Sequence, residues 1–375
     1  MPSPFDLQAD YEVKVIHPDG RYEDHIDQFL SLEYTLVVND VGSMTIVLPG
    51  NYPRTFIKPD WRFEIWRTVE GVSRLEGDTQ WIIQEIREAR DDSGNKTLTV
   101  VAYDWKIVLR RRIVAYAPNT GLGYSYNVGT SDEVLKSLFN RNFGTTALDT
   151  TRNIATYLPG SGTTGSGVTM GMEFSRQNIL DTMQKIAATS RQLGVPLYFD
   201  IITQAPPVGL TFLTYINCRG IDRRTGQPNA LRIGTEDGNI GAYEISEVYT
   251  DEITYVYAGG AGDDDLRLLS TQEDTGRSGR SFYGRKEAWF DFNETTDQDL
   301  LDSQAQAALY QNRPSKIFTG RLINTEGTLY GRDWGHGDYV TISTETEAFN
   351  CIISAIQVSV SDNGGEAIDA GLRSD

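Results

Sequence analysis

Histidine and cysteine, which often carry catalysis or bind metals, are few in this chain and are poorly spaced for either role. The three histidines, His17, His25 and His336, form neither an HExxH nor an HxH pattern. The two cysteines, Cys218 and Cys351, lie far apart and carry no CxxC spacing. A zinc site needs several nitrogen or sulfur ligands close together. These residues therefore predict no metal site, and both cysteines are expected to be buried free thiols.

Nucleophile and phosphate motifs are missing as well. The sequence contains neither the GxSxG turn that exposes a catalytic serine nor the GxxxxGK[ST] loop of phosphate sites. Its glycine-rich stretches do not stand between a buried strand and a helix, which is the setting that nucleotide binding requires. The sequence thus predicts a protein with no enzymatic activity, no catalytic residue and no cofactor.

Acidic clusters have both a chemical and a structural interpretation. Gly259–Asp265 resembles part of a calcium-binding nonapeptide repeat, but such repeats need stacked neighbours, so a solvated turn is favoured. Asp291 with Glu294, or Glu244 with Glu247, has the composition of a glycosidase pair. Close pairs are unavoidable among 52 acidic residues, and neither pair predicts glycoside hydrolysis.

Two further polar features are better explained by structure than by chemistry. Arg110–Arg112 is the basic run of the chain. Salt bridges at a strand end are its ordinary interpretation, and contact with an acidic partner subunit is the alternative. His336 lies between glycines in Trp334–Asp338 and is expected in a turn rather than as a ligand.

Composition limits the class of protein further. With 34 basic and 52 acidic residues among 375, the formal net charge is −18, which argues against a nucleic-acid-binding surface. DNA could still pass such a surface without adhering. No apolar run approaches the ~20 residues that span a bilayer. The N-terminus has no signal-peptide pattern, so we expect neither export nor stable membrane binding.

A β-hairpin is expected at Trp81–Arg112, where hydrophobic residues flank a turn whose Gly94 and Asn95 tolerate positive φ. The pattern returns at Cys351–Leu372. At one fixed offset, without a gap, Ile82-Ile83 matches Ile352-Ile353, Ile86 matches Ile356, Asp92 matches Asp362, Gly94 matches Gly364, and Leu98 matches Ile368. A β-unit used twice is therefore predicted, with chance hairpin similarity as the alternative.

The rest of the chain surrounds these hairpins with strands and three helices. Alternating segments between 10 and 66 predict short antiparallel strands in a small barrel or sandwich. Helices are expected at Ser131–Arg141, capped by Ser131, and at Ser175–Leu193, capped by Ser175, with a loop at 158–171 between them. A strand pair at 197–202 and 210–216, a long strand over 239–257 and a helix at Asp297–Asn312 complete the pattern.

Together these elements predict an α+β, mainly β fold with two related small β-barrels, an inserted α/β domain and an added helical segment. The first barrel takes residues 1–115 and is completed by strands from 231–257. The inserted α/β domain takes 116–230. The second barrel takes 258–375 and carries the helix near 297–312.

The order of these features resembles the central hub proteins of tailed-phage tail tips, both siphophage hub or Tal-like proteins and the hubs of contractile baseplates. The matching stretches are Thr79–Glu85 with Leu98–Asp104 and Leu109–Ile113, the helix 175–193 with Pro196–Asp200, Gly238–Ile240, Val256–Gly262, Arg285–Glu287 and Trp334–Thr341. They span nearly the whole chain, and their order is more specific than any one of them.

The resemblance implies a structural virion protein at the tail tip, assembled in the host cytoplasm. It implies a homotrimer in which two barrels per chain form a ring of six related units. Such a ring adapts a six-fold distal tail protein or tail tube ring to three-fold tail fibre or tip proteins. It encloses a channel for the tape-measure protein and for DNA as passing cargo, and an acidic wall would repel phosphates.

Longer relatives carry fibre or cell-wall-degrading domains at the C-terminus. This chain stops at Asp375, so those roles are expected to fall to other proteins. The alternative function is a receptor- or carbohydrate-binding tail protein, which six tryptophans and 19 tyrosines could serve by stacking on sugars. A shallow exposed row of Trp61, Trp66, Trp81 and Trp289 would favour that alternative, and buried rings would favour the hub.

Overall fold

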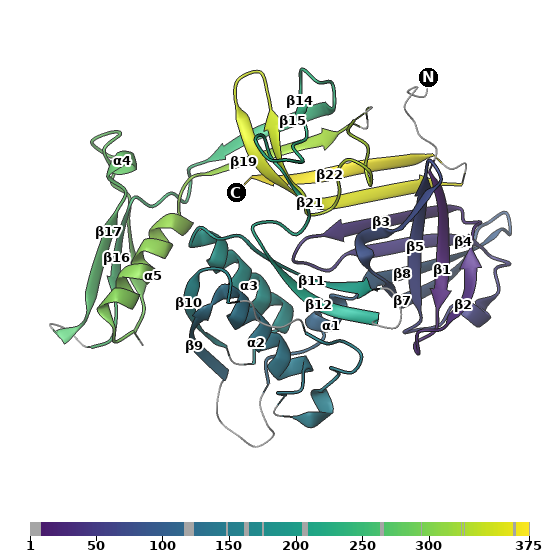
Figure 1. The fold of residues 1–375 in the computed structure, drawn as a ribbon, viewed down its shortest axis with the longest axis horizontal. Coiled ribbons are helices and arrows are strands. Elements are labelled where there is room, and N and C mark those ends of the chain that lie inside the picture. The colour runs from purple at the N-terminus through teal and green to yellow at the C-terminus, as the bar shows by residue number, and fades with distance from the viewer. Residues whose placement is uncertain are drawn as a thin grey trace.

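The computed structural model describes residues 9–115, 124–147, 149–160, 165–174, 176–204, 209–262, 266–293, 295–323, 325, 327–362 and 365–374. The fold is mainly β with a few helices, as expected (Figure 1). In these ranges, no helix combines the length and the apolar character that a membrane crossing demands.

The first eight strands form the N-terminal β-unit, at the right of Figure 1. They are β1 (Asp10–Ile16), β2 (Tyr22–Ile26), β3 (Ser31–Val37), β4 (Ser43–Pro49), β5 (Arg62–Val69), β6 (Val72–Leu75), β7 (Trp81–Arg90) and β8 (Lys96–Asp104). Buried and exposed residues alternate along β3 and β4, because successive side chains on a strand point to opposite faces. The predicted hairpin is confirmed as β7 and β8.

An α/β insert follows, below the sheet in Figure 1. It contains α1 (Ile107–Arg110), β9 (Tyr124–Thr130), α2 (Ser131–Phe143), β10 (Thr169–Phe174), α3 (Ile179–Gln192), β11 (Leu197–Gln204) and β12 (Gly209–Ile216). The predicted strand pair is confirmed, since β11 and β12 pair along their whole length. The helices α2 and α3 share a separate hydrophobic core with these strands, in which the rings of Phe139 and Phe212 stack 4.0 Å apart.

Two predicted helix caps need correction. The cap of α2 is Thr130, not Ser131: the Glu133 backbone N–H donates to Thr130, and the Thr130 N–H donates back to the Glu133 carboxylate. Ser131 is instead buried inside the helix, where it accepts a hydrogen bond from Ser190. The helix α3 begins four residues later than expected and is capped by Asn178. The proposed cap Ser175 lies outside the described residues.

The C-terminal half returns to the sheet with β13 (Asp222–Arg223), β14 (Ile233–Gly234), β20 (Tyr339–Ser343), β21 (Ala348–Ser361) and β22 (Glu366–Ser374). Its strands β15 (Ile240–Val248) and β19 (Ser315–Leu322) pair with each other in a separate two-stranded sheet. The hairpin predicted at 351–372 is confirmed as β21 and β22. Because β21 also pairs with β3, both halves share one 13-stranded sheet and one hydrophobic core. The described strands form no closed barrel, so the two-barrel prediction is not confirmed.

The expected long strand over 239–257 is wrong, because β15 ends at Val248 and the next strand begins only at Tyr255, in a different sheet. Residues 249–314 build a small unit from β16 (Tyr255–Gly259), β17 (Leu269–Glu273), α4 (Thr275–Ser278), β18 (Glu287–Asp291) and α5 (Gln298–Gln311). The helix predicted at 297–312 is confirmed as α5, with Asp297 as its cap. Strands from 231–257 do not complete the N-terminal unit: β14 pairs with β20, and β15 pairs with β19.

Candidate functional site

The structure does not bring the chemistry-bearing residues of the sequence together. His17 contacts Asp19, His25 contacts Tyr22, and His336 lies buried before β20. Both cysteines are free, Cys351 buried and Cys218 partly so. Throughout the described ranges, no three His, Cys, Asp or Glu side chains are grouped as metal ligands would be.

The structure also gives no support to the acidic pairs and the calcium site considered from the sequence. Glu247 binds Lys316 at 2.9 Å, and Glu244, three residues earlier on the same strand, faces the opposite side of β15. The structure therefore does not bring Glu244 and Glu247 together. Asp291 is paired with Arg267, and its proposed partner Glu294 lies outside the described residues. The end of the calcium candidate, 263–265, also lies outside them.

The basic run Arg110–Arg112 makes contacts within the chain. Arg110 pairs with Asp40 at 3.0 Å, and Arg111 donates to Gln84. Arg112 donates to two backbone carbonyls of the insert and lies over the Phe143 ring, 4.5 Å from its centroid. The run lies at the end of α1 rather than at a strand end, and Arg110 is its ion-paired member. Its described contacts join the N-terminal β-unit to the insert.

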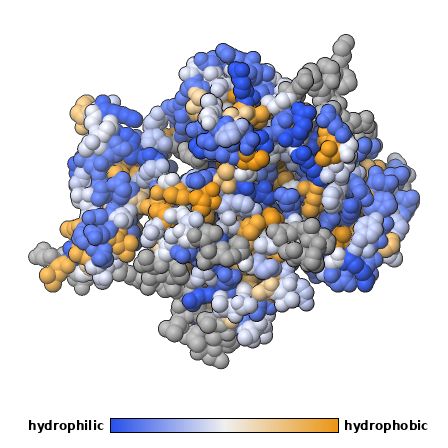
Figure 2. All heavy atoms as spheres, viewed as in Figure 1, coloured by the Kyte–Doolittle hydropathy of each residue, from blue (hydrophilic) through white to orange (hydrophobic). Residues whose placement is uncertain are grey.

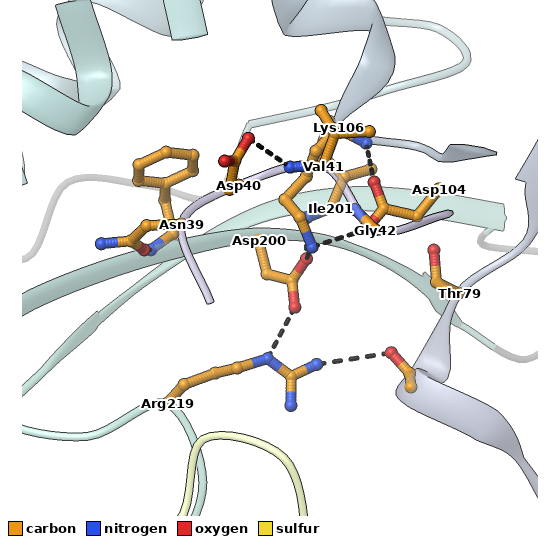
Figure 3. A network of polar contacts seen from close by, with 12 residues as sticks. Asn39, Asp40, Val41, Gly42, Thr79, Asp104, Lys106, Asp200, Ile201 and Arg219 are labelled. Atoms are coloured by element: carbon orange, nitrogen blue, oxygen red, sulfur yellow. Dashed lines mark hydrogen bonds and ion pairs between the residues drawn. The ribbon is translucent and has the colours of Figure 1, made fainter. Parts of the chain in front are cut away.

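Four charged side chains meet in the interior, and we call them the ionic junction: Asp104, Lys106 and Asp200, which are buried, and Arg219, which is mostly buried (Figure 3). Lys106 Nζ lies 2.9 Å from Asp104 and 3.1 Å from Asp200. Arg219 Nε lies 2.6 Å from the second oxygen of Asp200. Asp104 ends β8, Asp200 lies in β11, and Arg219 follows β12, so the junction joins the N-terminal unit to the insert.

The charged groups of the junction also make hydrogen bonds to the backbone. The Gly42 N–H donates to Asp104, and the Ile201 N–H donates to Asp200. Arg219 donates to the backbone carbonyl of His336. A buried charge is tolerated only when it is paired and hydrogen-bonded in this way.

The charges of the junction support one another. Burial by itself raises the pKa of Asp200, but the neighbouring Lys106 and Arg219 outweigh it and hold that pKa well below its usual range. Burial raises the pKa of Asp104, and Lys106 offsets part of that rise. Burial lowers the pKa of Lys106, yet the two carboxylates overcompensate and raise it. At neutral pH Lys106 is therefore cationic and Asp200 anionic.

The ring of His336 lies beside the junction and makes no hydrogen bond to it. The ring is buried, and neither ring nitrogen has a hydrogen-bond partner among the described residues. Burial lowers the pKa of His336 well below its usual value, and the charges of Arg219 and Lys106 lower it further. The histidine predicted in a turn is therefore a neutral packing residue at neutral pH.

A second buried cluster fastens the two halves of the sheet. Arg67 of β5 binds Glu366 of β22 through two hydrogen bonds of 3.0 and 2.6 Å. Glu76 accepts hydrogen bonds from Tyr34 at 2.9 Å and from Tyr330 at 2.5 Å. Both clusters are enclosed between packed elements, so they are suited to fixing the relative positions of the parts rather than to reacting with a substrate.

Sequence reasoning missed the basic members of these clusters. Asp104, Asp200 and His336 all lie in stretches that carry the family resemblance. Nothing in local spacing marked Lys106 or Arg219, because their partners are distant in sequence.

The two hairpins repeat in three dimensions, residue for residue. Ile83 pairs with Ala102 in the first hairpin, and Ile353 pairs with Leu372 in the second. The offset that carries Ile83 to Ile353 carries every residue pair between β7 and β8 onto a pair between β21 and β22. Each first strand has a bulge at the same place, at Gln84 and at Ser354. Gly364, one of the matched residues, lies outside the described part.

A third strand belongs to the repeat. Arg62 and Phe63 of β5 pair with Ile82 and Trp81, and Tyr339 and Val340 of β20 pair with Ile352 and Cys351, the counterparts of that pair. A shared register and a shared bulge over three strands are far more specific than two similar hairpins. The predicted repeated β-unit is therefore supported, and chance similarity is disfavoured.

The four tryptophans that test sugar binding do not form an exposed row. Trp61 and Trp81 are buried, Trp66 is partly buried, and Trp289 is 52% exposed. Hydrophobic residues on the face shown in Figure 2 lie in separate patches within a largely hydrophilic surface. By the criterion set from the sequence, the rings favour the hub.

Among curated protein sequences, none matches the chain. Solved structures and a family model do match it, and they agree with these observations. A tail protein from Neisseria meningitidis MC58 superposes with a TM-score of 0.58 at 14% identity, covering 97% of each chain. The 43 kDa tail protein of prophage MuSo2 from Shewanella oneidensis gives 0.57 at 12% identity, covering 97% of this chain and 98% of its own.

Prophage tail protein gp18 from Listeria monocytogenes EGD-e gives a TM-score of 0.53 at 12% identity, covering 97% of this chain and 94% of its own. At these identities the likeness shows a shared fold. The Siphovirus ReqiPepy6 Gp37-like protein family matches residues 12–372. The resemblance to phage tail proteins and the expected place in a virion tail are thereby confirmed, and the chain belongs to the Siphovirus ReqiPepy6 Gp37-like protein family.

Proposed function

We propose that this protein is the central hub of a phage tail tip, a structural homotrimer in which each chain contributes two related β-units to a six-unit ring. The observation that carries the proposal is the repeat of three strands with one register and one bulge. Two copies of one unit in each of three chains present six similar surfaces to a six-fold neighbour, while the trimer itself has three-fold symmetry.

In this proposal residues 1–115 supply the first unit, 116–230 form the insert, and 258–375 supply most of the second unit. The second unit also takes β15, because β15 pairs with β19. The ring adapts a distal tail protein or tail tube ring on one side to tail fibre or tip proteins on the other. Buried ion pairs at the seams keep the units in the fixed arrangement that such an adaptor needs.

The ring encloses a channel for the tape-measure protein and for DNA. The net charge of −18 supports an acidic wall that repels phosphates, so that DNA passes as cargo without binding. Charge-reversing substitutions on the channel face are expected to slow DNA ejection. Unchanged ejection by such variants would contradict an acidic channel.

The proposal is tested by the mass of the purified protein in solution, alone and mixed with neighbouring tail proteins. A three-fold mass, or a ring that forms only with a partner, is the expected result. A monomer that ignores those proteins and binds cell-wall glycans would overturn the hub and favour the receptor- or carbohydrate-binding function.

A further inference from the structure

Within one chain, the second β-unit joins the first by pairing strand edges. After its bulge, β21 pairs antiparallel with β3, from Ala355 opposite Val37 to Ser361 opposite Ser31. Gln357 donates a hydrogen bond to Glu33 across this seam. The seam therefore shows how one copy of the unit attaches to the next.

In the first unit the counterpart of β21 is β7. Among the described residues, no strand lies beside the edge of β7 that corresponds to the β3-paired edge of β21. In the described part of the chain, β7 pairs with β8 along one edge, and with β5 only at Trp81 and Ile82 on the other. From Gln84 to Arg90 that second edge is unpaired, and every side chain there except Ile86 is exposed. Unpaired backbone groups on a strand are a template for another strand.

The counterpart of β3 in the second unit is β15. The neighbour of β3 is β4, with Glu33 opposite Thr45, and the neighbour of β15 is β19, with Glu244 opposite Thr319. The neighbouring strands β4 and β19 bury matched residues, Met44 with Phe318 and Leu48 with Leu322. The outer edge of β15 is also unpaired among the described residues, since β19 is its one strand partner there.

We infer that β7 of one protomer pairs antiparallel with β15 of a second copy, so that every joint in the ring repeats the β21–β3 seam. This inference rests on the proposed hub. The two edges belong to different elements, so the contact is heterologous, and a heterologous contact closes into a ring when its rotation allows.

The repeat also fixes the register. Carrying the seam over by the same correspondences places Glu85 opposite Val248, Arg87 opposite Ser246 and Ala89 opposite Glu244. The hydrogen bond from Gln357 to Glu33 then becomes an ion pair between Arg87 and Glu244. The Glu244 side chain has no hydrogen-bond or ion-pair partner among the described residues, and Arg87 binds Glu85, two residues earlier on the same strand.

Engineered disulfides test the register. In a Cys218→Ser background, Arg87→Cys with Ser246→Cys places two thiols directly opposite each other across the proposed joint, within reach of a disulfide. Assembled protein should give covalent species of up to three chains, which vanish on reduction. Arg87→Cys with Glu247→Cys should give none, because those side chains point to opposite faces. Gln357→Cys with Thr35→Cys is the matched control within one chain.

The outcomes separate this inference from the hub itself. A three-fold mass without cross-links at 87 and 246 would overturn the strand pairing and leave the hub standing. A monomer under all conditions, tail partners included, would overturn both. Cross-linked species larger than three chains would support the pairing and overturn three-fold closure.

Charge reversal gives an independent readout. Arg87→Glu or Glu244→Arg should each lower the association constant about fivefold, because like charges across a strand pair destabilise it. The double reversal should restore association. Arg74→Glu, on the exposed strand β6, is the control and should leave the mass unchanged. Equal association of all four variants would overturn the predicted register.

Discussion

Lys106 lies between two buried carboxylates, and its removal tests the ionic junction at the scale of one residue. Lys106→Met leaves Asp104 and Asp200 with less counter-charge, so unfolding free energy should fall by about 3–5 kcal/mol. Urea denaturation monitored by tryptophan fluorescence measures it. Lys185→Met, at an exposed position on α3, should stay within about 0.5 kcal/mol of the wild type. Equal losses would contradict a structural role for the junction.

His336 should make stability depend on pH. Its pKa is depressed in the folded protein, mainly by burial, so the ring stays neutral there. The unfolded chain takes up a proton at this residue as pH falls through about 6.5. The unfolded state then binds more protons, and stability should fall from pH 7 toward pH 5 by up to about 1.4 kcal/mol per pH unit.

Denaturation of His336→Leu at several pH values checks this expectation. The variant should lose that component of the slope, because leucine takes up no proton. It should also fold, because the ring nitrogens of His336 have no described partners that the substitution would leave unsatisfied. His25→Gln, at an exposed position, is the control and should keep the wild-type slope. A slope that persists in His336→Leu would assign the effect to other groups.

Between elements, the repeat supplies matched positions in different environments. Ile356 of β21 is buried beneath the seam with β3, whereas its counterpart Ile86 of β7 is partly exposed. Ile356→Ala should cost about 2–5 kcal/mol of unfolding free energy. Ile86→Ala should cost clearly less in the monomer, as measured by the same denaturation.

In the assembled ring, the difference between Ile86→Ala and Ile356→Ala should become smaller. If β15 of a second copy covers β7, Ile86 becomes buried and Ile86→Ala should weaken association. If Ile86→Ala lowered the stability of the monomer as much as Ile356→Ala and left the mass of the assembled species unchanged, this account of the β7 edge would be contradicted. The bulges at Gln84 and Ser354 matter here because they bend each strand, so that its second half can meet a different neighbour.

For the whole molecule, the net charge of −18 sets how copies approach each other. Like-charged chains repel over a distance of about 10 Å at 0.1 M salt. Raising sodium chloride from about 0.05 to 0.5 M should therefore increase the three-fold species. Light scattering across a salt series measures it. A mass that falls with salt would instead make local ion pairs such as Arg87 with Glu244 the dominant contribution.

Local chemistry let the sequence determine several elements by itself. The turn at Asp91–Asn95 defines the first hairpin, because Gly94 adopts the positive φ of a tight turn and Asn95 donates hydrogen bonds to the Asp91 carboxylate. Asp297 and the apolar positions after it define α5. The echo between the hairpins was visible because side chains on a strand repeat with period two, so a shared register leaves a shared pattern.

Tertiary structure alone decided how these elements combine. The 249–314 unit interrupts what had looked like one strand, because β15 and β16 join different sheets. Thr130 rather than Ser131 caps α2, because Ser131 is buried against Ser190. The β21–β3 seam and the ionic junction depend on partners far apart in the chain, such as Lys106 and Asp200. Residue periodicity encodes which face of a strand is buried, but it does not encode which strand lies beside it, and this molecule's proposed role depends on that second choice.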